Sequence, residues 1–296
     1  MSAAAETPDA LAPVEDDPAR AATSRRRLPT PAKTAAVVVA LVALAALCAP
    51  LLAPYPPTVG VLDDRLAPIG SPGHLLGTDG QGRDILSRLL YGARPSLLTG
   101  LVPVAVSGSL GTCLGLVAGL GSRLTRGAVM RVLDVFYAFP AVLLAIAIAA
   151  ALGPGVSNSV IALSVILVPP VARVAEAETA RVRSADFVEA ARASGASRTT
   201  LAVRQVLPNI APGVLVYCTT LIGLSIVSAA GLSFLGLGIS PPAPEWGLML
   251  SDLQQYIFTE PRLLLVPVAV ILVVSVAFNV LGDGLRAALN VRLDTA

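Results

Sequence analysis

Hydrophobic residues are gathered in six long runs that short polar segments separate. The runs cover approximately residues 32–54, 95–120, 128–152, 157–174, 211–234 and 263–281. An α-helix needs about 20 apolar residues to cross the hydrocarbon core of a bilayer, and each run is close to that length. The pattern therefore predicts an all-α polytopic membrane protein with six transmembrane helices. Composition agrees, because 14% of the residues are charged and the mean hydropathy is +0.77, whereas a soluble domain carries about 25% charged residues.

The runs also divide the chain into regions. Residues 1–31 are rich in Ala, Pro and acidic residues and end in a basic flank, which predicts a disordered tail. A first transmembrane helix and a polar, Pro- and Gly-rich extracytoplasmic segment follow over 32–92, then a five-helix core over 93–290 and a short tail over 291–296. Two processing alternatives compete for the first run. A signal peptide is disfavoured because the run is long and no Ala-x-Ala site follows, and a lipoprotein site at Cys48 because Leu47 precedes it.

Basic residues predict the orientation. Six spans place both termini on one side of the membrane. Of the 21 Lys and Arg residues, 16 lie in the two tails, the 121–131 loop and the 173–208 segment, and 5 lie on the other side. Since cytoplasmic segments carry an excess of Lys and Arg, both termini are predicted to be cytoplasmic. The 186–208 segment is then a cytoplasmic loop between spans four and five.

Several kinds of chemistry are excluded. Lys33 is the only lysine, and Pro-Thr-Pro-Ala precedes it instead of the glycines of a nucleotide-binding P-loop. His74 is the only histidine, so a multi-His metal site is excluded. We therefore expect no catalytic residue, no metal site, no cofactor and no nucleic-acid partner. Asp134 and Asp283 lie near span ends, so no ionisable residue stands at mid-membrane depth, which argues against an ion-coupled carrier.

The polar 186–208 segment has helix signals of its own. Asp186 and Glu189 have the spacing of an N-cap and its capping-box partner, and Gly195 stands where a left-handed cap would end a short helix. Ser197 is expected to begin a second short helix, which Pro208 would stop. This helix–turn–helix is too polar to span a membrane, so it must be solvated or held by a partner.

At this point the residues resemble a known family. Glu189-Ala190-Ala191, with Gly195 and then Leu207-Pro208, resembles the cytoplasmic "EAA" loop of permeases in binding-protein-dependent ABC importers. Gln205 departs from the aliphatic residue that is common in this loop. Three further stretches, 76–96, 231–247 and 278–286, are similar to the C-type permease of dipeptide, oligopeptide and nickel importers. The first contains the extracytoplasmic signature Gly77, Thr78, Asp79, Gly82, Arg83 and Asp84. Residues 256–261 depart from the family pattern, so the resemblance leaves the cargo open.

The resemblance implies a type I ABC importer permease in the inner membrane of a bacterial cell. Its coupling loop would dock on separate ATPase subunits through Asp186, Glu189, Ala190, Ala191, Gly195, Leu207 and Pro208. The implied partners are two ABC ATPase subunits, a second homologous permease that forms a heterodimer, an extracytoplasmic substrate-binding protein and the lipid bilayer. The implied cargo is dipeptides or oligopeptides, with nickel chelates or other small solutes as the alternative. A carrier or channel independent of ATPase subunits, and a membrane scaffold, are the competing classes.

Some residues have two interpretations. Glu189 is expected to cap a helix, to contact the ATPase, or both. The Gly77–Asp84 segment is a solvated turn, an interfacial collar near the mouth of the pathway, or a contact for the binding protein. Pro140 is expected to kink span three, either statically or as part of a gate. Glycines 108, 111, 115 and 119 recur at near-helical spacing and predict a face for close helix packing.

Overall fold

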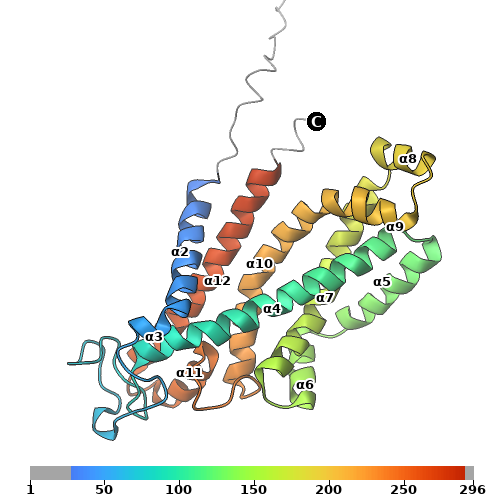
Figure 1. Cartoon of the computed structure of the whole chain (residues 1–296). Helices are drawn as coiled ribbons and strands as arrows, with labels where there is room; N and C mark the ends of the chain where they lie inside the picture. The colour runs from blue at the N-terminus through green and yellow to red at the C-terminus, as the bar shows by residue number, and fades with distance from the viewer. Residues whose placement is uncertain (1–27, 291–296) are drawn as a thin grey trace, which may run out of the picture.

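The computed structural model describes residues 28–290, which form helices joined by turns and one long connection (Figure 1). Within this range there are two isolated β-bridges and no strand, so the all-α prediction is confirmed. The predicted tails lie outside the described residues, except for residues 28–31. In chain order the helices are α2 (Thr30–Leu47), α3 (Ala49–Leu52), η1 (Leu62–Asp64), α4 (Ile85–Leu120), α5 (Arg123–Tyr137), α6 (Ala141–Leu152), α7 (Val156–Val182), α8 (Asp186–Ala193), α9 (Arg198–Thr200), η2 (Leu201–Val206), α10 (Leu207–Phe234), α11 (Trp246–Leu253), η3 (Gln254–Tyr256) and α12 (Pro261–Asn290).

Five helices within the described residues are long and apolar enough to cross a membrane: α2, α4, α7, the continuous helix from Arg198 to Phe234, and α12. A sixth span results when α5 and α6 count as one span bent by 84°. These elements coincide with the six predicted runs. Apolar side chains along them face outwards, among them Leu41, Leu110, Leu215 and Leu272, as expected of a surface in contact with lipid or another apolar partner.

The third span is broken more sharply than the predicted kink. α5 ends at Tyr137, and Pro140 is the N-cap residue of α6 with φ −57° and ψ 122°. Proline disfavours a helical conformation in the residue before it and has no N–H to continue the helical hydrogen bonding. The chain therefore turns at residues 138–140, and the two half-helices diverge by 84°.

The first helix of the core begins earlier than expected. The polar connection was predicted to run to Gly92, but α4 starts at Ile85 because Asp84 caps it, its carboxylate accepting a hydrogen bond from the Ser87 backbone N–H at 2.7 Å. Arg94 on the same helix donates from Nε to the carbonyl of Ala46 at 2.6 Å. It thereby satisfies a backbone acceptor at the end of α2.

Glycines bring α4 and α7 close together, and this pair makes the largest helix–helix contact in the described part of the chain. A Cβ atom added at Gly115 would lie 2.5 Å from Cβ of Ala175, and one at Gly111 would lie 2.8 Å from Cβ of Val171. Such distances are possible only with glycine. The predicted small-residue face is confirmed for Gly111, Gly115 and Gly119, whereas Gly108 faces Cys218 on α10. The close contact positions α7 for the site described below.

The other long helices complete the bundle around α10, which packs against α4, α7 and α12, while α12 also packs against α2. The start of α2, the end of α12 and the short helix α8 lie at one end of the molecule (Figure 1). The segment before α4, together with α3 and α11, lies at the opposite end. The two ends thus carry the 186–208 loop and the 77–84 signature, two of the stretches that the family resemblance singled out.

Candidate functional site

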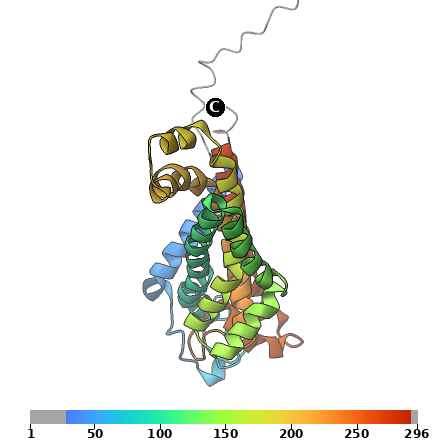
Figure 2. The same cartoon turned by 90° about the vertical axis from the view of Figure 1, so that its right-hand side faces the viewer.

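The short helix α8 projects from one end of the bundle, between the end of α7 and the start of the Arg198–Phe234 helix (Figures 1 and 2). Val188 is fully buried and packs with Leu201, Val206 and Ile210. The other face of α8 exposes Asp186, Glu189, Ala190 and Ala193, and the aromatic side chain of Phe187 is also exposed. α8 is therefore anchored by one face and presents a low, partly acidic surface on the other.

The turn after α8 has the predicted left-handed cap at Gly195, whose φ is +82°. The backbone N–H of Gly195 donates to the carbonyl of Arg192 at 3.0 Å, and that of Ala196 to the carbonyl of Ala191 at 3.1 Å. These two bonds form a Schellman motif, in which the left-handed residue is usually glycine. The prediction for Gly195 is confirmed.

The predicted capping box at the start of α8 was wrong. The N-cap residue is Ala185, and within the described chain no side chain caps this helix. The backbone N–H of Ala185 bonds to the carbonyl of Val182 at 3.0 Å, so the turn after α7 extends one residue further and makes Asp186 the first helical residue. Asp186 and Glu189 both lie in the first turn, where negative charge is favoured by the helix dipole.

The second helix begins as predicted but does not stop at Pro208. The Ser197 hydroxyl accepts a hydrogen bond from the Thr200 backbone N–H at 3.2 Å, which confirms Ser197 as N-cap. The helix then continues from Arg198 to Phe234 through the π-helical stretch η2. Pro208 follows directly after this π-helical stretch, where the Leu207 N–H bonds to the carbonyl of Ala202, so its missing N–H falls where the hydrogen-bond pattern of the helix changes. Leu207 packs against the small core around Val188.

At the opposite end, the signature segment is buried rather than solvated, so its interpretation as a solvated turn was wrong. Thr78, Asp79, Arg83 and Asp84 are all at most 2% exposed. Asp79 accepts hydrogen bonds from the backbone N–H groups of Gln81 at 2.8 Å and Arg83 at 3.0 Å. Gly77 and Gly82 have positive φ of +77° and +72°, a backbone conformation that favours glycine.

Two arginines and two aspartates join this segment to α11. Nε of Arg83 lies 2.6 Å from Oδ2 of Asp79, and its Nη2 lies 3.0 Å from Oδ2 of Asp252. Nη2 of Arg88 lies 3.2 Å from the same Asp252 oxygen. Opposite charges are balanced, as buried ions require. We refer to Asp79, Arg83, Arg88 and Asp252 as the ion cluster. Arg88 and Asp252 were not identified from sequence, because more than 160 residues separate them.

His74 also contacts the signature segment. Its Nδ1 lies 3.0 Å from Oδ1 of Asp84, and its ring stacks at a tilt against Tyr55 with 4.8 Å between centroids. Since Asp84 also caps α4, the imidazole ties the long connection to the start of that helix. The only histidine of the chain thus has a structural role at this end of the molecule.

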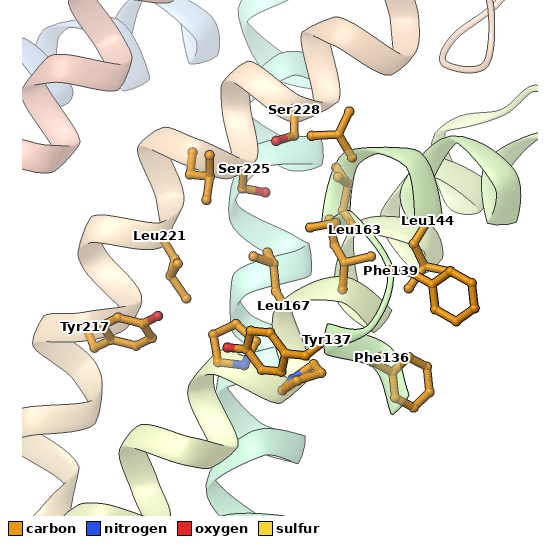
Figure 3. Close-up of a pocket in the computed structure, with 16 residues that line it drawn as sticks. Phe136, Tyr137, Phe139, Leu144, Leu163, Leu167, Tyr217, Leu221, Ser225 and Ser228 are labelled. Carbon is orange, nitrogen blue, oxygen red and sulfur yellow. The ribbon is translucent and has the colours of Figure 1, made fainter. Parts of the chain in front are cut away.

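A cavity of about 250 Å³ lies at the break between α5 and α6, against the middle of α7 and of α10 (Figure 3). Its lining has no charged side chain among the described residues. The hydroxyl groups of Tyr137 and Tyr217 point toward each other across it, and Ser225 and Ser228 lie on α10 along one wall. Arg173 covers the ring of Tyr137 at 4.2 Å and pairs with Asp134. Because these residues fall inside apolar runs, sequence patterns gave no signal for the cavity.

These features define a helical membrane protein with a short exposed helix at one end and an uncharged cavity at the break between α5 and α6. Residues 111–295 match the family described as "Binding-protein-dependent transport system inner membrane component". The chain belongs to this family, and it is a multi-pass inner-membrane permease subunit. It is 42% identical to the glutathione transport system permease protein GsiD of Pectobacterium atrosepticum, over 78% of this chain and 76% of that protein. It is also 42% identical to GsiD of Shigella dysenteriae, over 88% and 86%.

The chain is also similar to a di/tripeptide permease in sequence and to a solved transporter in structure. The di/tripeptide transport system permease protein DppC of Pseudomonas aeruginosa is 42% identical over 86% of each chain. The inward-facing MetNI methionine ABC transporter matches with a TM-score of 0.57 and 18% identity, over 70% of this chain and 97% of that chain. At this identity the likeness supports the helical arrangement alone.

Proposed function

We propose that this chain is the permease subunit of an ATP-driven importer of small peptides, and that ATPase subunits act on it through α8. The relatives named above are permeases for glutathione, itself a tripeptide, and for di- and tripeptides. The observation that carries the coupling assignment is α8 itself, a short exposed helix anchored at one end of the bundle through Val188. Dipeptides or oligopeptides are accordingly the proposed cargo.

The distribution of charge supports an orientation for the molecule. The end that carries α8 also receives the start of α2 and the end of α12 (Figure 1). Within residues 28–290, the segments predicted to be cytoplasmic hold 11 Lys and Arg residues, and the segments of the opposite end hold 5. By the positive-inside rule the end with α8 faces the cytoplasm, where ATP is available, and the ion cluster faces the other side. Both termini are therefore cytoplasmic in this proposal.

The packing of α8 provides a route for mechanical coupling. Val188 contacts Leu201 and Val206 on the helix that continues into α10, and Val182 at the end of α7 packs against the same small core. α7 and α10 also line the cavity at the α5–α6 break. Movement of an ATPase subunit against α8 would therefore be passed to the two helices that line the pathway. Ala190 and Glu189 lie on its free face, and Gly195 closes the turn behind it.

The proposal requires further subunits. Two ATPase subunits, a second homologous permease and an extracytoplasmic substrate-binding protein would complete the transporter in the bilayer. ATP hydrolysis would take place on the separate ATPase subunits.

The signature residues at the other end serve a different purpose in this proposal. Gly77, Thr78, Asp79, Gly82, Arg83 and Asp84 form the rigid base of the extracytoplasmic segment. Their side chains are too buried to touch a binding protein directly. Exposed residues of the same segment, such as Leu62 and Leu75, would provide the contact surface.

Cysteine cross-linking tests the coupling assignment. Ala190→Cys is introduced into the complete transporter after Cys48, Cys113 and Cys218 have been replaced by Ser. Leu75→Cys, at the opposite end, is the matched control because it is also exposed. We expect position 190 and not position 75 to cross-link to an ATPase subunit. An active complex without a cross-link at 190, or with one at 75, would contradict the assignment.

A further inference from the structure

The cavity at the break between α5 and α6 has the properties of a binding recess rather than of a packing defect. Four of its lining side chains are aromatic, in a chain that has 6 Phe, 5 Tyr and 1 Trp: these are Phe136, Tyr137, Phe139 and Tyr217. Three of the four come from the six residues around the break. The break thus brings three of the 12 aromatic residues of the protein to the recess, and Tyr217 on α10 is the fourth.

The polar groups of this surface have no partners within residues 28–290. The phenol groups of Tyr137 and Tyr217 point toward each other across the cavity (Figure 3), and neither makes a hydrogen bond to another described residue. Ser225 is 1% exposed and its Oγ likewise lacks a partner in the described chain. Most buried hydroxyl groups in proteins are hydrogen-bonded. Tyr137 is 48% exposed and Tyr217 is partly buried, so water reaches the phenols, whereas the Oγ of Ser225 is shielded from water. The buried Ser225 hydroxyl, with the two phenols beside it, indicates that a ligand supplies the missing partner.

We propose that this recess receives an uncharged side chain of the transported peptide, while the tyrosine hydroxyls bond to its adjacent amide group. The inference rests on the peptide import proposed above. A volume of about 250 Å³ is somewhat below the range of about 300–1,000 Å³ for drug-sized ligands. It suits one part of a solute rather than a whole one. No charged side chain lines the recess, and Arg173, which covers the ring of Tyr137, is already paired with Asp134. A charged side chain would therefore be desolvated there without a counter-ion of its own.

Other occupants fit the recess less well. A lipid acyl chain matches the aromatic walls but has no group that can bond to the phenols of Tyr137 and Tyr217. Solvent alone satisfies hydroxyls but does not explain the gathering of aromatic side chains. An amide beside an apolar side chain offers both, since its carbonyl accepts and its N–H donates. The position of the recess, midway along α7 and α10, also suits a point on the pathway.

The test uses the complete transporter in proteoliposomes, with its binding protein and with Leu-Leu and Gly-Gly as probes. For each variant, the ratio of Leu-Leu uptake to Gly-Gly uptake is divided by the same ratio for the wild-type transporter. Because the binding protein is the same in both, its preference for one peptide cancels. Ala141→Phe partly fills the recess, and Ala141 is exposed, so the larger side chain does not disturb the core. We expect the ratio of Leu-Leu to Gly-Gly uptake to fall about 10-fold, with Gly-Gly uptake retained. An unchanged ratio, as for a recess filled by lipid, overturns the proposal.

Removal of single hydroxyls supplies an independent measurement. Tyr217→Phe and Tyr137→Phe keep the rings, and each is expected to raise KM for Leu-Leu by about 3- to 10-fold, with kcat little changed. Tyr91→Phe is the control matched to Tyr217→Phe, because Tyr91 is likewise partly buried and lies outside the recess. Equal effects at all three positions overturn the proposal. Wild-type transporter that takes up neither peptide overturns peptide import itself, and the recess assignment with it.

Discussion

The hydroxyl of Ser96 on α4 donates a hydrogen bond of 2.9 Å to Oε1 of Glu245, the residue that caps α11. The buried Glu245 carboxylate also accepts from the backbone N–H groups of Gly247 at 3.0 Å and Leu248 at 2.8 Å. Next to it, the indole N–H of Trp246 donates to the carbonyl of Leu89 at 3.0 Å. Together these bonds fix α11 against the start of α4, although the two helices are far apart in sequence.

Substitution of Glu245 by Ala should destabilise this end of the protein. The change leaves two buried backbone N–H groups and the Ser96 hydroxyl without an acceptor, which we expect to cost about 2–4 kcal/mol. Trp246 is the only tryptophan, so its fluorescence during denaturant unfolding in detergent reports directly on the affected region. Glu260→Ala, in which no hydrogen bond or ion pair of a described side chain is lost, should change stability by less than about 0.5 kcal/mol. Equal losses in the two variants would contradict the role of Glu245.

The ion cluster predicts an order of effects for its two carboxylates. The side chain of Asp79 is 4% exposed and that of Asp252 is 26% exposed. Asp79→Ala leaves the charges of Arg83 and Arg88 short of their buried partner and should cost about 3–5 kcal/mol. Asp252→Ala should cost less, about 1–3 kcal/mol, because water reaches that oxygen. Apparent melting temperatures in one detergent provide the comparison. A greater loss for Asp252→Ala would show that solvent does not relieve the unpaired arginines.

Close packing of α4 on α7 predicts opposite outcomes for two glycines. Gly115→Ala places a methyl group 2.5 Å from Cβ of Ala175 and should cost about 1–3 kcal/mol, because the helices must separate. Gly231→Ala, on α10, has no described atom within 4 Å of the new methyl group. It should stabilise the protein by about 0.5–1 kcal/mol through higher helix propensity. Melting temperatures measured in parallel test both signs, and a stabilised Gly115→Ala variant would exclude tight packing at that position.

Much of the architecture could be predicted from the sequence because the physical cause is local. A run of about 20 apolar residues has few alternatives to a membrane span, and the glycine spacing of 111, 115 and 119 already describes one helix face. Gly195 was likewise predictable, because a left-handed cap favours glycine at the end of a short helix. In each case neighbouring residues carry the information.

Other features depend on contacts that local patterns do not encode. Asp252 meets Arg83 across 169 positions in sequence, and nothing around either residue identifies the partner. The recess unites Tyr137 and Tyr217 only because the chain breaks at Pro140, where a milder kink was expected. At α8 the capping box failed by one residue, because the preceding turn extends to Ala185 and shifts Asp186 into the helix. Small shifts in turns are set by tertiary packing and are therefore the least predictable.

Because Glu189 does not cap α8, contact with an ATPase subunit is the one role left of the two predicted for it. Its side chain is exposed and makes no hydrogen bond or ion pair to another described residue. Glu189→Ala should therefore change stability by less than about 0.5 kcal/mol while lowering ATP-driven uptake at least several-fold. Ser197→Ala is the informative contrast, because it removes a real N-cap and should cost about 1 kcal/mol in stability. Unfolding in detergent and uptake in proteoliposomes, measured on the same preparations, separate the two effects. If Glu189→Ala lost stability and kept full uptake, Glu189 would be a structural residue of α8, and its surface would no longer be the proposed point of contact with the ATPase.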